Sequence, residues 1–324
     1  MKNDETKVNS HDMQLLQADF DKSRGFHQLP FPPNAIDDKH PLSFSDKLSM
    51  AEFAAIGLGG EVGELLNGLK KIRRNLAING IETFDPQALL GEVADVYSYL
   101  LKLSNILGHD LEVAYLEKMC LNRYRFPALE KGQRPAFIIA GPPGSGKSSV
   151  SAALERMNRK GRTIYIEDFS QNPFLLDAIS QGSSVFESQE WFLEKVRSFL
   201  AGRSSEKSVT VIDQSPLAIP LVYGHDFYAG SILGRSDYLF HLQNYLRLHG
   251  EFDSAVSSIS TIYLTADIDT LMHRCSAKGF VDRDWLVRIV ERFHIIRDLS
   301  EVCIDTTGMS LDEVVLRVES LIED

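Results

Sequence analysis

The stretch GPPGSGKSSV at residues 141–150 follows the short apolar run AFIIA at 136–140, and it constrains the fold more than any other feature of the chain. Its glycines, lysine and serine fit the pattern G-x-x-x-x-G-K-[ST], in which backbone N–H groups surround phosphate oxygens, the lysine reaches the β and γ oxygens and the hydroxyl binds Mg²⁺. The apolar strand before the loop and the helix-forming SSVSAALERM after it supply the required context. The residues assigned to nucleotide binding here are Gly141, Gly144, Ser145, Gly146, Lys147, Ser148 and Ser149.

Length and composition set the outer bounds on fold and function. The 324 residues are about twice the roughly 150 typical of one domain, and 44% of them are hydrophobic, which is enough for two cores. The net charge of -11 argues against a binder of duplex nucleic acid or of an anionic membrane surface. Three scattered cysteines form no CxxC motif, and no apolar run approaches a membrane span or a signal sequence. We therefore expect a cytoplasmic protein.

The chain has two different sequence textures. Up to Phe126, apolar residues recur at helical spacing, with polar or proline-bearing breaks between the helices, which is typical of an all-α bundle. From Pro135 onward, short β-rich runs alternate with helical segments, which predicts a parallel sheet with crossover helices. We predict an all-α domain at 1–127, a linker at 128–134 and an α/β P-loop domain at 135–324.

Two of the β-rich runs end in carboxylates, and doubly wound sheets place ligands at this end of their strands. Glu167 follows TIYI, and Asp213 ends SVTVID. Both carboxylates could instead cap the helices that follow them. Between them, SVFESQEWFLEKVRSFL predicts a helix that carries Gln189, which could also be a solvated surface residue.

In these positions the second half resembles the deoxynucleoside kinase family. The resemblance rests on Glu167, the NPF segment at 172–174, Gln189, the Asp237-Tyr238 pair and TIYLTADIDTLMHRCSAKG. It implies that Glu167 is the base toward the acceptor hydroxyl, that Gln189 binds the acceptor base, and that ATP is the phosphoryl donor. It also implies a lid whose cations close over the donor phosphates, here Arg274 and Lys278.

One departure from this family concerns the acceptor. The family's acidic-Arg-Ser triplet is Asp213, Gln214 and Ser215 in this chain, so a cation beside the acceptor is missing. Either the acceptor differs, for example a nucleoside monophosphate as in the related thymidylate kinases, or the kinase is weak. A carboxylate beside an incoming phosphate is repulsive, however, so we favour a nucleoside hydroxyl. Asp213 and Gln214 are then expected to position its sugar.

The helical half contains two pairs of carboxylates, each spaced three residues apart. Glu61 and Glu64 form one pair, and Glu92 and Asp95 form the other. Residues three apart share one face of a helix, so each pair points in one direction. Pairs of this kind are usually solvated, but small and apolar residues flank both of these, and four converging carboxylates would repel one another without a cation such as Mg²⁺.

This arrangement, E-x-x-E followed by E-x-x-D, resembles the MazG-type all-α nucleoside triphosphate pyrophosphohydrolases over residues 12–127. The resemblance implies hydrolysis of a nucleoside triphosphate to its monophosphate and pyrophosphate, with Mg²⁺ held by the four carboxylates. It also implies phosphate contacts from the following helix, EKMCLNRYRFP, and a homo-oligomer, a dimer or tetramer, formed through the helical domain. The residues of that helix that are expected to contact phosphate are Lys118, Asn122 and Arg125.

Three functions remain open on the sequence. The first is a bifunctional enzyme of (deoxy)nucleotide metabolism whose substrates are nucleotides and nucleosides. The second keeps the hydrolase but makes the P-loop half another small-molecule kinase or a zeta-toxin-like kinase. The third is a nucleotide-binding sensor or assembly module without turnover. Base and sugar specificity are not encoded in any motif of the chain.

Overall fold

The computed structural model describes residues 9–31, 42–80, 87–126, 135–202, 209–277 and 282–323. These residues form two compact units, Met1–Tyr115 and Leu116–Asp324. The linker predicted at 128–134 lies outside the described residues, and so does Lys278. Each unit is considered by itself below.

The first unit is helical, as its apolar periodicity predicts. It contains α1 (Ser10–Arg24), the 3₁₀ turn η1 (Phe26–Gln28), α2 (Phe44–Asn79), α3 (Gln87–Leu107) and the start of α4 (Leu111–Arg125). Local sequence sets the helix ends. Asn9 with Asp12 and Ser43 with Asp46 form capping boxes, and left-handed glycines end α1 and α2.

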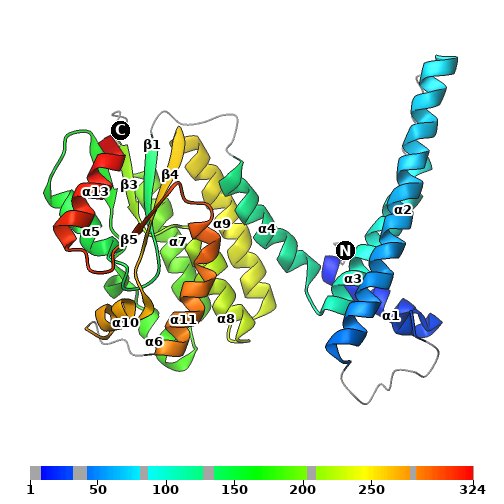
Figure 1. The fold of residues 1–324 in the computed structure, drawn as a ribbon, viewed down its shortest axis with the longest axis horizontal. Coiled ribbons are helices and arrows are strands. Elements are labelled where there is room, and N and C mark those ends of the chain that lie inside the picture. Colours follow the sequence, from blue (N-terminus) through cyan, green and yellow to red (C-terminus); the bar gives the residue numbers. More distant parts are fainter. Residues whose placement is uncertain are drawn as a thin grey trace, which may run out of the picture. The chain divides into compact units, whose positions relative to one another are not determined.

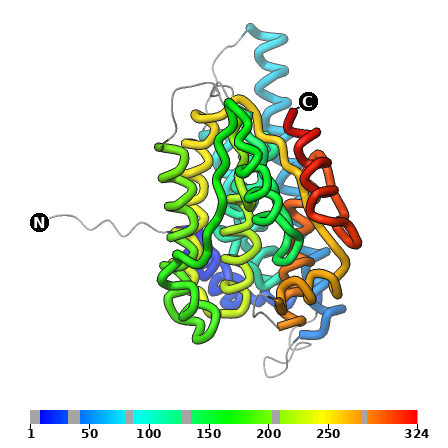
Figure 2. The backbone as a smooth tube through the Cα atoms, turned by 90° about the vertical axis from the view of Figure 1, so that its left-hand side faces the viewer, coloured from blue at the N-terminus to red at the C-terminus, as the bar shows by residue number. Residues whose placement is uncertain are grey.

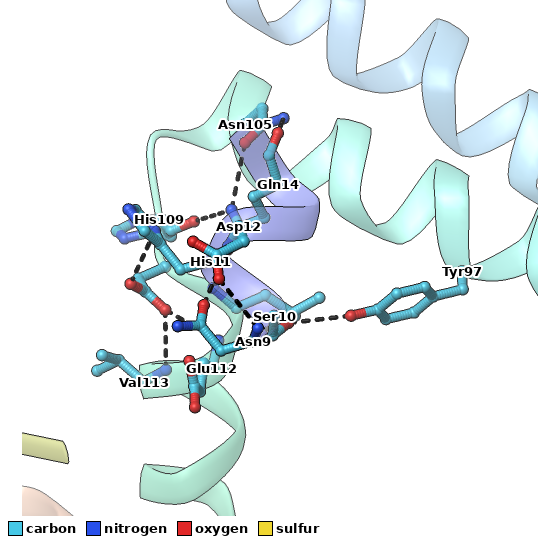
Figure 3. A network of polar contacts seen from close by, with 12 residues as sticks. Asn9, Ser10, His11, Asp12, Gln14, Tyr97, Asn105, His109, Glu112 and Val113 are labelled. Atoms are coloured by element: carbon cyan, nitrogen blue, oxygen red, sulfur yellow. Dashed lines mark hydrogen bonds and ion pairs between the residues drawn. The ribbon is translucent and has the colours of Figure 1, made fainter. Parts of the chain in front are cut away.

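Helix α3 is the centre of this unit, because both α1 and α2 pack against it. A buried polar network fixes α1 to the end of α3 (Figure 3). The side chain of Gln14 donates to Asn105 Oδ1 at 3.2 Å and to the His109 carbonyl at 3.0 Å, and it accepts from the Leu111 N–H at 2.9 Å. Near the start of α1, the hydroxyls of Ser10 and Tyr97 lie 3.0 Å apart.

The second unit is built on a five-stranded parallel sheet, which confirms the predicted α/β texture. Its strands are β1 (Pro135–Ala140), β2 (Arg162–Tyr165), β3 (Val209–Asp213), β4 (Ser258–Thr265) and β5 (Val302–Asp305). Their order in the sheet is β2-β3-β1-β4-β5, and every pairing is parallel. Strand β1 is therefore central, with β3 on one side and β4 on the other, and the chain crosses between the two halves of the sheet at this point.

Helices connect the strands and cover both faces of the sheet (Figure 1). The helical elements are α5 (Lys147–Arg156), η2 (Phe169–Gln171), α6 (Leu175–Gln181), α7 (Val185–Ala201), the π-helix η3 (Ile219–Gly224), α8 (His225–Ala229), α9 (Arg235–Ala255), α10 (Ile268–Ser276), α11 (Arg283–Arg292), α12 (His294–Arg297) and α13 (Leu311–Glu323). Helices α5 and α13 pack together on one face, with a buried core between them and the sheet. On the other face, α7 and α9 lie side by side (Figure 2).

Residues 116–125 of α4, which the sequence analysis assigns to the first domain, belong to the second unit. The reason is a set of specific contacts along α4. Cys120 is fully buried, Arg123 donates to the Leu246 carbonyl at 2.9 Å, and the Tyr124 hydroxyl is hydrogen-bonded to Thr261. Helical periodicity cannot show this, because it marks an apolar face without identifying the partner that covers it. Across the described ranges, none of the helices combines the length and the apolar character that a membrane crossing requires.

Candidate functional sites

The loop after β1 has the backbone geometry that its glycines predict. Gly141, Gly144 and Gly146 all have left-handed φ values, of 148°, 81° and 101°. A Cβ at Gly141 would overlap the Leu264 carbonyl, and one at Gly144 would lie 2.8 Å from the Leu271 carbonyl. These two positions therefore need glycine both for conformation and for space.

Helix α5 begins at the end of this loop. Among the described residues no side chain caps the first turn of this helix. The N–H groups at the helix N-terminus therefore remain available to an anion held by the loop. Lys147 is buried and donates to the Pro142 carbonyl at 3.0 Å. The Ser145 hydroxyl is also buried and has no hydrogen-bond partner within the described part of the chain. Ser148 is half-buried and Ser149 is exposed on the same first turn.

Arg274, predicted as a lid residue, contacts the loop from α10. Its guanidinium donates to the Gly144 carbonyl at 3.2 Å, to Thr306 Oγ1 at 2.9 Å and to the Thr306 carbonyl at 3.0 Å. Arg274 thus joins the phosphate loop to the segment after β5. Its contact with donor phosphates stays a prediction.

Glu167 follows β2, and Asp213 is the last residue of β3, the neighbour of β2 in the sheet, so their carboxylates come together beside the loop lysine. Burial is the largest cause that raises the pKa of Glu167, the Asp213 charge adds to it and the Lys147 charge opposes it, and together they bring this pKa to about 8. Asp213 is only 1% exposed, whereas Glu167 is half-buried. A carboxyl with a raised pKa, beside a phosphate loop and partly open to solvent, is suited to accept a proton.

The neighbouring acid, Asp168, has a different role. It caps η2, accepting from the Ser170 N–H at 3.1 Å, from the Ser170 hydroxyl at 2.5 Å and from the Gln171 side chain at 2.9 Å. These hydrogen bonds lower the pKa of Asp168, with the Ser170 hydroxyl as the largest cause. Asp168 is therefore the residue that caps η2.

Gln214 lies next to Asp213 in an unusual backbone conformation. Its φ of 78° is left-handed, and its N–H donates to the Ile139 carbonyl at 3.0 Å. A side chain with a Cβ adopts this region at a cost, and such residues concentrate at functional sites. Its side-chain amide donates to the Tyr223 hydroxyl at 3.4 Å and accepts from the Ser215 N–H at 3.2 Å.

Tyr223 is a site residue that the sequence analysis missed. Burial raises the pKa of its hydroxyl, and the next cause is the charge of Glu167, so the two side chains are neighbours. Its ring is stacked with Trp285 of α11, with centroids 6.5 Å apart and planes 21° apart. Tyr223 belongs to a π-helix, whose spacing differs from the α-helical pattern, and no local signal in IPLVYG marks it as a site residue.

Gln189 lies inside the second unit, on α7. It is 5% exposed, and its Oε1 has no hydrogen-bond partner within the described ranges. The alternative of a solvated surface residue therefore does not hold. A buried acceptor atom without a partner has a large desolvation cost, which a ligand N–H or O–H would remove.

In the first unit, three of the four predicted carboxylates converge. Each of Glu61, Glu92 and Asp95 offers an oxygen, and these atoms all lie within 4.8 Å of one another. Glu64 is not in this group, but its charge contributes to the raised pKa of Glu61, after desolvation and the charge of Asp95. Three hard oxygen donors at this spacing fit a Mg²⁺ ion that keeps several water ligands.

A pocket of about 400 Å³ shares Asp95 with this carboxylate cluster. It lies among α1, η1 and α3, and its lining is Gln17, Phe20, Asp21, Phe26, Asp95, Ser98, Tyr99 and Lys102. The Lys102 ammonium lies 3.6 Å from the Asp21 carboxylate and donates to the Phe26 carbonyl at 3.1 Å. A pocket of this size with aromatic walls and a few fixed polar groups is suited to a small heterocyclic ligand.

The α4 residues predicted to contact phosphate are in the second unit. Lys118 and Arg125 are exposed and Asn122 is half-buried, and the Arg125 guanidinium lies 5.7 Å from the centroid of the Phe126 ring. Their contact with a nucleotide held by the carboxylates stays a prediction.

Three solved structures of deoxyadenosine kinase from M. mycoides are similar to part of this chain, each at 16% sequence identity. The structure with bound dATP has a TM-score of 0.49 and covers 58% of this chain and 100% of its own. Those with bound dCTP and with the products dCMP and dCDP have TM-scores of 0.47 and 0.46, and each covers 58% of this chain and 98% of its own. No family model matches the chain, and no curated protein matches it.

Proposed function

We propose that the second unit is a kinase that transfers the γ-phosphoryl group of ATP to a (deoxy)nucleoside. The observation that carries this proposal is that the carboxylates of Glu167 and Asp213 lie close to Lys147 of the phosphate loop. Lys147 and the first turn of α5 hold the donor phosphates, and Ser148 is positioned to hold Mg²⁺, which neutralises charge on the transferred group. Glu167 accepts the proton of the attacking hydroxyl.

The choice of acceptor rests on the charges around this base. Glu167 and Asp213 are both carboxylates, and Gln214 is a neutral amide hydrogen-bonded to Tyr223. An incoming monophosphate would be repelled by the two acids. A nucleoside brings no such charge, and its N–H or O–H groups match the Oε1 of Gln189, which has no hydrogen-bond partner among the described residues.

The pH dependence of the transferase reaction follows from Glu167. Its pKa in the free protein is raised to about 8, so at lower pH it is protonated and cannot accept a proton. We expect kcat/KM for the acceptor to rise with pH and to level off above about 8, because kcat/KM reports the free protein. The Glu167→Gln variant should lose this rising limb. A profile that is unchanged in the variant would contradict the assignment.

For the first unit we propose Mg²⁺-dependent hydrolysis of a (deoxy)nucleoside triphosphate to its monophosphate and pyrophosphate. The convergence of Glu61, Glu92 and Asp95 supports it. When bound, Mg²⁺ would polarise the phosphate that is attacked. The carboxylates hold the ion and orient the attacking water. The adjoining pocket is large enough to take the nucleoside part of the substrate.

The two proposed reactions share a class of metabolite. The first yields a nucleoside monophosphate from a triphosphate, and the second phosphorylates a nucleoside, so both act on the nucleotide pool. The discriminating experiment incubates the protein with Mg²⁺ and each common NTP and dNTP, and separately with ATP and each nucleoside and nucleoside monophosphate, and resolves the products by chromatography. Tight binding without turnover of any of them would favour a sensor, and transfer only to another acceptor would favour a different kinase.

We also propose that the first unit forms a homo-oligomer, a dimer or tetramer. Its long helix leaves large apolar side chains exposed, including Phe44, Ile56 and Leu66 at 83%, 76% and 59%. Exposed apolar surface on this scale is typical of an interface. Light scattering at micromolar concentration should give at least twice the chain mass. A fully active monomer would contradict the proposal.

A further inference from the structure

Gln189 has a buried side chain and two sequence neighbours that are each held by side-chain hydrogen bonds. On one side is Ser188, which is fully buried, and on the other is Glu190, whose side chain is 22% exposed. Ser188, Gln189 and Glu190 are consecutive residues at the junction of the first and second turns of α7, so contacts that fix Ser188 and Glu190 also fix the direction of the Gln189 side chain.

Ser188 is held by the segment that follows β2. The side chain of Asn172 donates to the Ser188 carbonyl at 3.2 Å and makes a second hydrogen bond to its hydroxyl at 3.0 Å. The Asn172 side-chain oxygen accepts from the Phe174 N–H at 3.0 Å. Asn172 is five residues from Glu167, so this contact links the helix of Gln189 to the segment of the proposed base.

Glu190 is held by two side chains of α9. One of its carboxylate oxygens lies 2.5 Å from Nδ1 of His241, and the other accepts a hydrogen bond from the side chain of Asn244. The His241 side chain is completely buried. It also packs against the π-helix, since a Cβ on Gly224 would lie 3.1 Å from Cδ2 of His241, next to Tyr223.

We propose that Asn172 with Ser188 and the Glu190–His241–Asn244 cluster form a clamp that positions Gln189 to read an N–H donor on the base of the acceptor. This inference rests on the proposed nucleoside kinase function. The members of the clamp are positioning residues, because they act through Gln189. Both carboxylate oxygens of Glu190 are used within the protein. Oε1 of Gln189 has no partner in the part of the chain that the structure describes, so this atom is left for a ligand.

The clamp predicts a specific loss of acceptor recognition. Glu190→Ala leaves the buried His241 Nδ1 and the Asn244 amide without their carboxylate partner, so α7 shifts at its second turn. We expect KM for the nucleoside to rise about tenfold to a hundredfold, the cost of misplacing a positioning group by about 1 Å, while KM for ATP is unchanged. Glu190→Gln, which keeps one acceptor oxygen for His241, should recover part of this loss.

A more specific measurement is the preference of the protein between two acceptors that differ in one N–H donor. Phosphorylation of deoxyadenosine is compared with that of its analogue dimethylated at the exocyclic amine, and phosphorylation of thymidine with that of its analogue methylated at the ring imide nitrogen. Each methylated analogue lacks the N–H donor. The wild type should prefer the unmodified member of each pair that it phosphorylates, and Glu190→Ala should reduce that preference.

Asp253→Ala is the matched control. Asp253 pairs with another buried histidine of the same helix, His249, at 3.3 Å, but His249 packs on Tyr124 and Tyr245. Asp253→Ala should lower the stability of the protein without changing its acceptor preference. Hydrogen exchange should become faster at residues 186–193 in Glu190→Ala but not in Asp253→Ala. Equal effects of the two variants on KM and preference, or full preference in Glu190→Ala, would overturn the clamp. A wild type that phosphorylates no nucleoside would instead overturn the proposed function, and with it the acceptor role of Gln189.

Discussion

Replacing Glu61 with glutamine should abolish pyrophosphate release from every triphosphate that the wild type hydrolyses, and leave ATP-dependent transfer to the acceptor unchanged. Glu61 is the member of the carboxylate cluster contributed by α2, whereas Glu92 and Asp95 both come from α3. An amide is a poor ligand for Mg²⁺ compared with a carboxylate, so the variant should no longer bind the ion at working concentrations. Asp95→Asn should have the same effect.

The transferase should survive because its phosphate loop and Ser148, the residue proposed to hold its Mg²⁺, are in a different unit. Glu52→Gln is the matched control, since Glu52 is an exposed glutamate of the same helix, nine residues before Glu61 and on its opposite side. It should leave both activities intact. Loss of both activities in Glu61→Gln, with the protein still folded by circular dichroism, would show that the two sites are not independent.

Replacing Glu167 with glutamine should lower kcat of the transferase about a hundredfold or more, which is the usual contribution of a positioned general base. The amide has nearly the same shape but cannot take the proton of the attacking hydroxyl. ATP affinity should change little, because Lys147 and the α5 N-terminus are the groups proposed to hold the donor. The measurement is a steady-state assay with the acceptor varied, paired with ATP binding by calorimetry.

Asp168→Asn provides the control for this experiment. Asp168 is adjacent to Glu167, but it is exposed and caps η2. Its replacement should therefore lower the free energy of unfolding slightly and leave kcat nearly unchanged. An intact rate of transfer to a nucleoside monophosphate in Glu167→Gln would overturn the role of Glu167 and favour a monophosphate kinase. Equal losses in the two variants would indicate a structural effect of this segment.

The sequence by itself determined those features that depend on neighbours along the chain. The phosphate loop is one, because its glycines, lysine and serine occupy fixed positions between a strand and a helix. The five parallel strands are another, because each is a short apolar run that ends in turn residues. Spacing by three residues put Glu92 and Asp95 on one helix face, and both lie in the carboxylate cluster.

Only the tertiary structure decided which groups meet across long stretches of chain. It brought Asp213 of strand β3 and Lys147 of the phosphate loop close to Glu167, where their charges act on its pKa. It buried Gln189, placed Tyr223 of a π-helix beside the proposed base, and packed the end of α4 into the second unit. The physical reason is that periodicity specifies which face of an element is apolar, whereas the partner of that face is set by packing across the whole fold.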